Sequence, residues 1–220
     1  MITTEALAAD WPPTIKTDSL SSEETLAVHA LTASLHNAKT HLLNFHSALS
    51  LFNANFRLPS ENQKGIDTAS WKDVAFRDGA MTVFHFGKTI EGVRNYLNLH
   101  PTPFPFTKPK VDLADIKESV KMLKASFPFY EDLRHAVAHA GELNRTAETM
   151  RSHTYSGTIS FGDEMSIQLN GAQGGHITHG NTFFIGFEGK ILSYELSEKS
   201  LSNMTSIRDV FWRAFSKCKS

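Results

Sequence analysis

Apolar residues recur at helical spacing over roughly the first two thirds of the chain and at alternating spacing after that. From about residue 22 they step by four and three for more than twenty positions, which predicts one long core helix. The residues of this seam are Leu31, Leu35, Ala38, Leu42, Phe45, Leu49 and Phe52. Ser21 or Ser22 supplies an N-cap, and Glu24 lies in the first turn, where a carboxylate complements the helix dipole. The histidines of this helix share no stripe and are expected at the surface or in helix–helix contacts: His29, His36, His41 and His46.

A second helix is predicted over about residues 69–97. Its apolar positions cover almost the whole circumference, which is typical of a helix at the centre of a bundle or at an interface. Its glycines, Gly79 and Gly92 among them, weaken the helix but let a neighbouring backbone or the motif helix approach closely. A proline-rich run then breaks the helical pattern, and Asp112 caps a third helix through about residue 126.

A fourth helix is predicted from Glu131 to about Arg151, after which the spacing changes to the alternation of strands. Two hairpins are expected in one small antiparallel sheet, one turning at residues 162–164 and the other at residues 188–189. The glycine-rich stretch 170–181 between them is expected to be a loop or a frayed edge strand.

These elements predict an α+β fold with an antiparallel helical bundle over residues 22–152. Antiparallel β hairpins occupy residues 153–197, and a C-terminal helix within 198–220 packs on the same domain. Residues 1–21 contain Trp11 followed by two prolines, a composition that favours an extended leader over a helix.

Composition narrows the function classes. The chain has 220 residues, 22 basic against 23 acidic and a formal charge of −1, so nucleic-acid binding would need a local basic site. The single cysteine, Cys218, excludes an intrachain disulfide and fits a reducing compartment. The sequence shows neither a secretory signal nor an apolar run long enough for a membrane span, so we expect a cytoplasmic protein with no membrane partner.

Residues 133–143 are the stretch that most resembles a chemical site. His135 and His139 are four apart and therefore lie one above the other on a helix, with Glu142 one further step along the same face. Arg134 is about 140° around the helix axis from His139, so only its long side chain, or a second subunit, can bring a guanidinium near that imidazole.

Two other interpretations of this cluster stay open. A polar cluster on a helix is often a solvated face or a hydrogen-bonded interface. Two histidines at this spacing also suit zinc, but a zinc site needs further ligands and Glu142 is the one local candidate. The pair His176 and His179 in the glycine-rich stretch lacks further ligands as well. We therefore expect no metal and no cofactor.

Arg134, followed after four residues by His139 in an apolar helix, resembles the Arg-x4-His signature of HEPN domains, a helical superfamily rich in RNases. The sequence Phe-Arg-Asp-Gly-Ala at residues 76–80, the Phe-Pro pair before the motif helix and the β-rich tail add to this likeness. Together they are similar to HEPN-like proteins associated with abortive infection. The resemblance covers most of the chain from about residue 22 onward.

The resemblance implies an antiparallel HEPN-like helical bundle and a metal-independent endoribonuclease in a defence or toxin–antitoxin setting. His139 would transfer a proton and Arg134 would clamp the phosphate, with His135 as a supporting donor or second proton carrier. Glu142 would support the motif. Arg77 and Asp78 would support the site too, unless they form a structural ion pair or cap.

The partners that the resemblance implies are a second copy of the chain in a homodimer, an RNA substrate, and an antitoxin or regulatory protein. The alternative is a catalytically inactive HEPN-like binding or regulatory module whose motif helix builds the dimer interface. Catalysis requires Arg134 and His139 to converge in an open cleft, whereas a structural role permits both to be buried and mutually satisfied.

Overall fold

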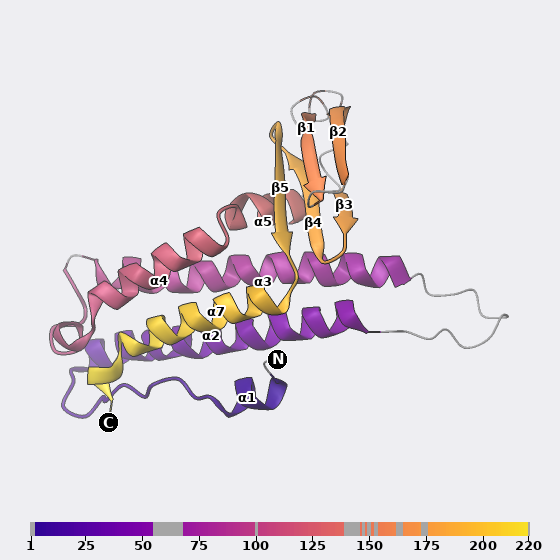
Figure 1. Ribbon diagram of the computed structural model, residues 1–220. Coiled ribbons are helices and arrows are strands. Elements are labelled where there is room, and N and C mark those ends of the chain that lie inside the picture. The colour runs from indigo at the N-terminus through magenta and orange to yellow at the C-terminus, as the bar shows by residue number, and fades with distance from the viewer. Residues whose placement is uncertain are drawn as a thin grey trace. The chain divides into compact units, whose positions relative to one another are not determined.

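The computed structural model describes residues 3–54, 68–99, 101–138, 154–161, 165–172 and 176–219, with Thr146, Glu148 and Arg151 (Figure 1). The fold is α+β, as predicted, with helices and two small antiparallel sheets. The chain divides into two compact units: a first unit of Met1–Ser47, Thr82–Pro128 and Glu198–Ser220, and a second unit of Ala48–Met81 and Phe129–Ser197. The predicted boundary at residue 153 does not separate these units. The reason is that the apolar side of the strands packs on helical residues of the second unit.

The core of the first unit is built on the predicted seam of α2 (Ser22–Asn53), which together with α3 (Thr68–Leu97) contributes residues to both units. Every seam residue that α2 gives to this unit is fully buried: Leu31, Leu35, Ala38, Leu42 and Phe45. Ser21 is the N-cap, because its Oγ accepts a hydrogen bond from the backbone N–H of Glu24 at 3.2 Å. Periodicity therefore identified this helix correctly, including its start.

A second helix pair in the first unit joins α4 (Leu113–Ser126) to α7 (Glu198–Arg213). Asp112 caps α4 as predicted, since its carboxylate accepts hydrogen bonds from the backbone N–H groups of Ala114 and Asp115. The C-terminal helix α7 thus packs on a helix of the first unit.

The N-terminal segment departs from the extended leader predicted for residues 1–21, because α1 (Thr4–Ala9) is a short helix within it. Thr3 caps this helix by accepting a hydrogen bond from the backbone N–H of Ala6, and an alanine-rich sequence favours the helical turn. The extended conformation resumes after α1, where Ile15 forms an isolated β-bridge with Lys219.

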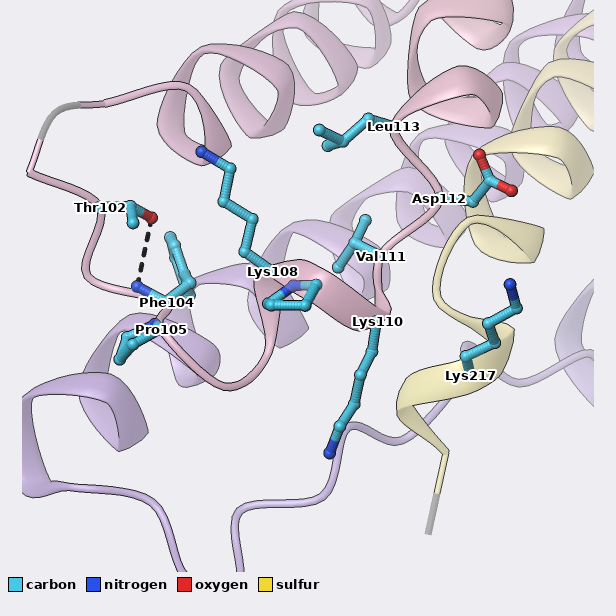
Figure 2. Close-up of a pocket in the computed structure, with 10 residues that line it drawn as sticks. Thr102, Phe104, Pro105, Lys108, Lys110, Val111, Asp112, Leu113 and Lys217 are labelled. Atoms are coloured by element: carbon cyan, nitrogen blue, oxygen red, sulfur yellow. Dashed lines mark hydrogen bonds between the residues drawn. The ribbon is translucent and has the colours of Figure 1, made fainter.

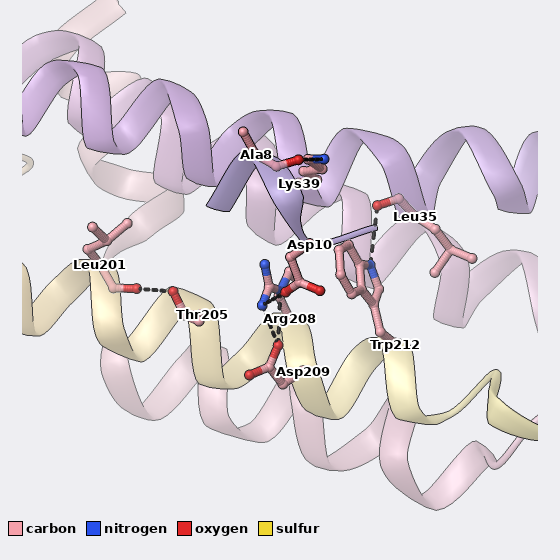
Figure 3. Close-up of polar contacts among 9 residues, drawn as sticks. All are labelled: Ala8, Asp10, Leu35, Lys39, Leu201, Thr205, Arg208, Asp209 and Trp212. Carbon is pink, nitrogen blue, oxygen red and sulfur yellow. Dashed lines mark hydrogen bonds and ion pairs between the residues drawn. The ribbon is translucent and has the colours of Figure 1, made fainter. Parts of the chain in front are cut away.

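Charged side chains hold this segment on α2 and α7 (Figure 3). Arg208 is only 3% exposed, and its Nη2 lies 2.5 Å from Asp10 and 2.6 Å from Asp209. On the α2 side, Lys39 Nζ lies 4.0 Å from the ring centroid of Trp11. A buried guanidinium is stable only when it is paired, so the contact with Asp10 joins the leader firmly to the first unit.

Histidines join α2 to α3 in the first unit, which confirms the expected helix–helix role for one of them. The rings of His41 and His85 stack with centroids 6.0 Å apart, and His41 Nε2 lies 3.3 Å from Thr89 Oγ1. Burial, aided by the charge of His85, lowers the pKa of His41 from 6.5 to about 4.

Acid is expected to weaken the fold through His41. Its folded pKa of about 4 lies below the value of 6.5 for the free side chain, so between these values the unfolded chain binds more protons and acid favours unfolding. Because solvent screens this partly buried ring, we expect a loss on the order of 1 kcal/mol between about pH 7 and about pH 4.5. Urea unfolding of the wild type and of His41→Gln at both pH values measures this loss. An equal loss in the variant would contradict the assignment to His41.

The strands of the second unit form two antiparallel sheets in the orders β1-β2 and β3-β4-β5, where a single sheet was predicted. Their bounds are Tyr155–Phe161 (β1), Met165–Ala172 (β2), His176–His179 (β3), Thr182–Phe187 (β4) and Lys190–Glu195 (β5). The predicted second hairpin is confirmed, because Phe183 pairs with Tyr194 and the chain turns at Glu188 and Gly189, with φ of 46° and 73°.

The first predicted hairpin is confirmed by the register of β1 and β2, in which Ile159 pairs with Ile167. Its expected turn at residues 162–164 lies outside the described residues. Within the stretch 170–181, β3 is an edge strand that pairs with β4, which agrees with the second of the two predicted conformations. The strand can form here because β4 supplies a hydrogen-bonding partner that local propensity does not take into account.

A close approach between α3 and β5 anchors the sheet in the second unit. The Tyr194 hydroxyl donates a hydrogen bond to the backbone carbonyl of Phe76, and the rings of these two residues meet edge to face with centroids 6.1 Å apart. A Cβ on Gly79 would lie 2.7 Å from Tyr194 Oη, so glycine is required there. Gly79 is closely approached, but by the Tyr194 side chain and not by a backbone or the motif helix as predicted. Gly92 has open space around it.

Replacing Gly79 with alanine is expected to destabilise the protein by about 2 kcal/mol, because the added methyl group overlaps a hydroxyl that is buried and hydrogen-bonded. Thermal or urea unfolding measures the loss. Tyr194→Phe removes the oxygen, and the next ring atom would then be 3.6 Å away, so the double variant should recover part of the loss. Gly92→Ala is the matched control and should be neutral or slightly stabilising, as expected for an open helical position. Equal costs at both glycines would contradict this explanation.

The helix that carries the candidate motif is shorter than predicted. The described part, α5, spans Tyr130–Ala138, and Thr146 lies in a bend, so one helix does not continue to Arg151. The sequence between Ala138 and Thr146 contains Gly141 and Asn144, which have low helix propensity. The prediction of a longer helix gave more weight to the spacing of the apolar residues than to these two. Residues 139–145 lie outside the described residues.

Candidate functional site

The second unit places Arg134 and His135 at the solvent side of α5. The helix begins with the Leu133 N–H donating to the carbonyl of Phe129 at 2.8 Å, and acidic residues occupy its first turn. Its apolar face is buried through Tyr130, Leu133, Ala136 and Val137. This packing fixes the rotation of the helix, so Arg134 is left half-buried and His135 exposed.

Arg134 and His135 contact each other directly, with Arg134 Nη1 3.3 Å from His135 Nδ1. A guanidinium carries only N–H donors, so Nδ1 must be the acceptor in this contact. The tautomer that fits this contact carries its proton on Nε2. His135 thus acts on the guanidinium as an orienting acceptor.

A residue of the sheet stacks with the same imidazole. The ring of His135 lies nearly parallel to that of Phe187 at the end of β4, with an interplanar angle of 13° and centroids 6.5 Å apart. An aromatic neighbour restricts the rotation of the imidazole, and the imidazole in turn orients Arg134. A residue of the sheet therefore lies beside the candidate site.

The other predicted site residues are placed as follows. His139 and Glu142 lie outside the described residues. Arg77 and Asp78 are exposed on α3, and among the described residues neither makes an ion pair or hydrogen bond with Arg134 or with His135. Partial burial raises the pKa of Asp78, whose carboxylate faces the buried Tyr194. The alternative role predicted for Arg77 and Asp78, a structural ion pair or cap to another helix, is also not seen among the described residues.

A second polar pair, between Asp73 of α3 and His176 of β3, was not predicted. His176 Nε2 lies 2.9 Å from Asp73 Oδ1, and the imidazole stacks on Phe183 with centroids 5.1 Å apart. Side chains three positions apart in a strand point to opposite faces, so His176 and His179 do not converge on one metal ion. Among the described residues, no group of three or more histidine, cysteine or acidic side chains is placed to hold a metal.

We compared the chain with protein-family models, with curated proteins and with solved structures. None of them matches it.

Within the described ranges, no helix is both long enough and apolar enough to cross a membrane. The function must therefore be inferred from the side chains of the site.

The pair on α5 is chemically suited to an anionic substrate. A guanidinium is planar and always charged, and its parallel N–H groups match two oxygens of a phosphate. The contact with His135 is made by Nη1 of this group. An arginine that is oriented before binding loses less side-chain entropy when it takes up the phosphate.

Proposed function

We propose that this chain is a HEPN-like, metal-independent endoribonuclease that acts as a homodimer in a defence or toxin–antitoxin setting. The observation that supports the proposal is the 3.3 Å contact between Arg134 and His135 on the solvent side of α5. It gives the Arg-x4-His sequence an arginine that is oriented and partly exposed, as a phosphate clamp must be.

Each motif residue has one role in this proposal. The 2′-oxygen of the RNA attacks the adjacent phosphorus, forming a P–O bond to the 2′-oxygen while the bond to the 5′-oxygen breaks. His139 takes the 2′-hydroxyl proton or returns one to the leaving 5′-oxygen. Arg134 stabilises the charge that builds on the phosphate, and His135 positions Arg134. The products are a 2′,3′-cyclic phosphate and a 5′-hydroxyl end.

Cleavage of a mixed cellular RNA pool in EDTA tests the proposal. The wild type is expected to cleave and to leave 2′,3′-cyclic phosphate ends, whereas Arg134→Ala and His139→Ala, each shown to be folded by circular dichroism, are expected to lose this activity. Light scattering of the same samples tests the homodimer. Cleavage that both variants retain would assign the activity to another site or to a contaminant.

Failure of the wild type to cleave would favour the alternative, a catalytically inactive HEPN-like module that binds a regulatory protein or antitoxin. Since the contact between Arg134 and His135 is then structural, both alanine variants should lower the stability of the dimer without any effect on RNA. Concentration-dependent light scattering distinguishes this result from a simple failure of the assay.

A further inference from the structure

The first unit carries a groove lined by lysines, which we call the basic groove (Figure 2). Its larger part has a volume of about 610 Å³ between the proline-rich segment and the C-terminus, where Lys108, Lys110 and Lys217 line it. A smaller hollow of about 90 Å³ shares Lys110 and Lys217 and adds Lys16 and Lys219. Because the two hollows share lining residues, they form one continuous surface.

Positive charge in the basic groove is not neutralised by the protein. Among the described residues, none makes an ion pair or hydrogen bond with any of these five ammonium groups. Two acidic side chains line the groove, Asp18 and Asp112, and the Asp112 carboxylate already accepts hydrogen bonds at the start of α4. A chain with a formal charge of −1 therefore has one strongly basic region on this unit.

The lysines are spread out and do not converge. In Figure 2 the side chains of Lys108 and Lys110 extend in opposite directions, and that of Lys217 comes from the C-terminal segment. A compact anion needs cations aimed at one point, whereas an anionic chain needs them at intervals along a surface. The arrangement thus fits an extended polyanion with regularly spaced charges.

An exposed aromatic ring on the same segment adds a second feature. Phe106 is 62% exposed, although Phe104, two residues before it, is fully buried. The backbone N–H groups of Phe106 and Thr107 donate to Glu24 Oε1 at 3.1 and 2.8 Å, and Glu24 is only 1% exposed. A buried carboxylate thus fixes the loop in a conformation that leaves an aromatic ring in solvent. Aromatic rings of this kind stack on nucleic-acid bases whatever their sequence.

We propose that the basic groove binds single-stranded RNA, with its lysines along the phosphates and Phe106 stacked on a base. The choice of RNA over other polyanions rests on the proposed nuclease function. The site itself lies wholly within the first unit, so binding there is a separate property from cleavage at α5.

Fluorescence anisotropy with a labelled 2′-O-methyl oligouridine of about 12 nucleotides, within the range that one such surface covers, tests the groove. This strand keeps phosphates and bases but lacks the 2′-hydroxyl, so it can be bound and not cleaved. Wild type is expected to bind it with an affinity that falls steeply between about 50 and 200 mM salt. The double variant Lys110→Gln/Lys217→Gln should reduce, by about 1.4, the magnitude of the slope of the logarithm of the association constant against the logarithm of the salt concentration.

Three further variants test whether binding depends on the basic groove or only on the total positive charge of the protein. Lys190→Gln/Lys199→Gln removes the same charge from exposed positions outside the groove and should leave the slope unchanged. Phe106→Ala should weaken binding about tenfold, whereas Phe106→Trp should keep it. Three results would overturn the proposal. The wild type does not bind the strand, both lysine pairs have equal effects on the slope, or heparin displaces the strand as well as unlabelled oligouridine does. Binding without cleavage of unmodified RNA would overturn only the nuclease.

Discussion

Replacing Glu24 with alanine is expected to lower the free energy of unfolding by about 3 kcal/mol, the largest effect on stability that we predict for one side chain. Glu24 Oε1 accepts the backbone N–H groups of Phe106 and Thr107, and Thr107 is itself buried. Alanine leaves both donors without their acceptor, and a buried donor that loses its partner costs about 1–3 kcal/mol.

Urea unfolding near neutral pH measures this loss, and two matched variants identify its cause. Glu24→Gln keeps an oxygen that can accept both hydrogen bonds, so it should lower the free energy of unfolding by about 1 kcal/mol or less. The substitution also removes the negative charge of a carboxylate whose second oxygen, Oε2, has no hydrogen-bond partner among the described residues. Glu23→Ala removes the same charge from an exposed position in the same helical turn and should be close to neutral. A loss for Glu24→Gln as large as that for Glu24→Ala would assign the effect to charge instead of hydrogen bonding.

Glu24 also shows which of its contacts can be predicted from the sequence and which cannot. Ser21 followed by Glu24 predicted the start of α2, and the Ser21 cap is present because an N-cap depends on residues three positions apart. The Glu24 carboxylate was expected to complement the helix dipole, yet it binds a loop more than eighty residues away. No local pattern contains that contact, since it depends on how the proline-rich segment crosses the unit.

The same distinction applies to the rest of the fold. The seam of α2 and the hairpin that turns at residues 188–189 follow from the periods of a helix and of a strand, so both were predicted. The basic groove and the pair of Asp73 with His176 were missed, because each joins residues from separate segments of the chain. The histidine pair at residues 176 and 179 was set aside as a metal site because it lacks further ligands, and the strand geometry adds that the two side chains point to opposite faces.

For the candidate site, helical geometry put Arg134 on a different face from His139, which left its orientation open. The structure supplies an orienting group that was not expected in that role, since the neighbouring His135 accepts a hydrogen bond from Arg134. Helical neighbours one position apart do not normally face each other. This contact arises because Arg134 has a long side chain and Phe187 of β4 stacks on the imidazole. A sheet residue therefore completes an arrangement that the helix alone does not specify.

Replacing His135 with alanine is expected to lower the rate of RNA cleavage about 100-fold, while asparagine should keep the rate within about tenfold of the wild type. Both variants remove an imidazole, but the asparagine side-chain oxygen can still accept the N–H of Arg134. Single-turnover cleavage in EDTA at several pH values measures the difference, with exposed His179→Ala as the matched control. If His135 only positions Arg134, the asparagine variant keeps the pH profile of the wild type. A proton carrier at position 135 would instead make asparagine as damaging as alanine and would remove one limb of that profile.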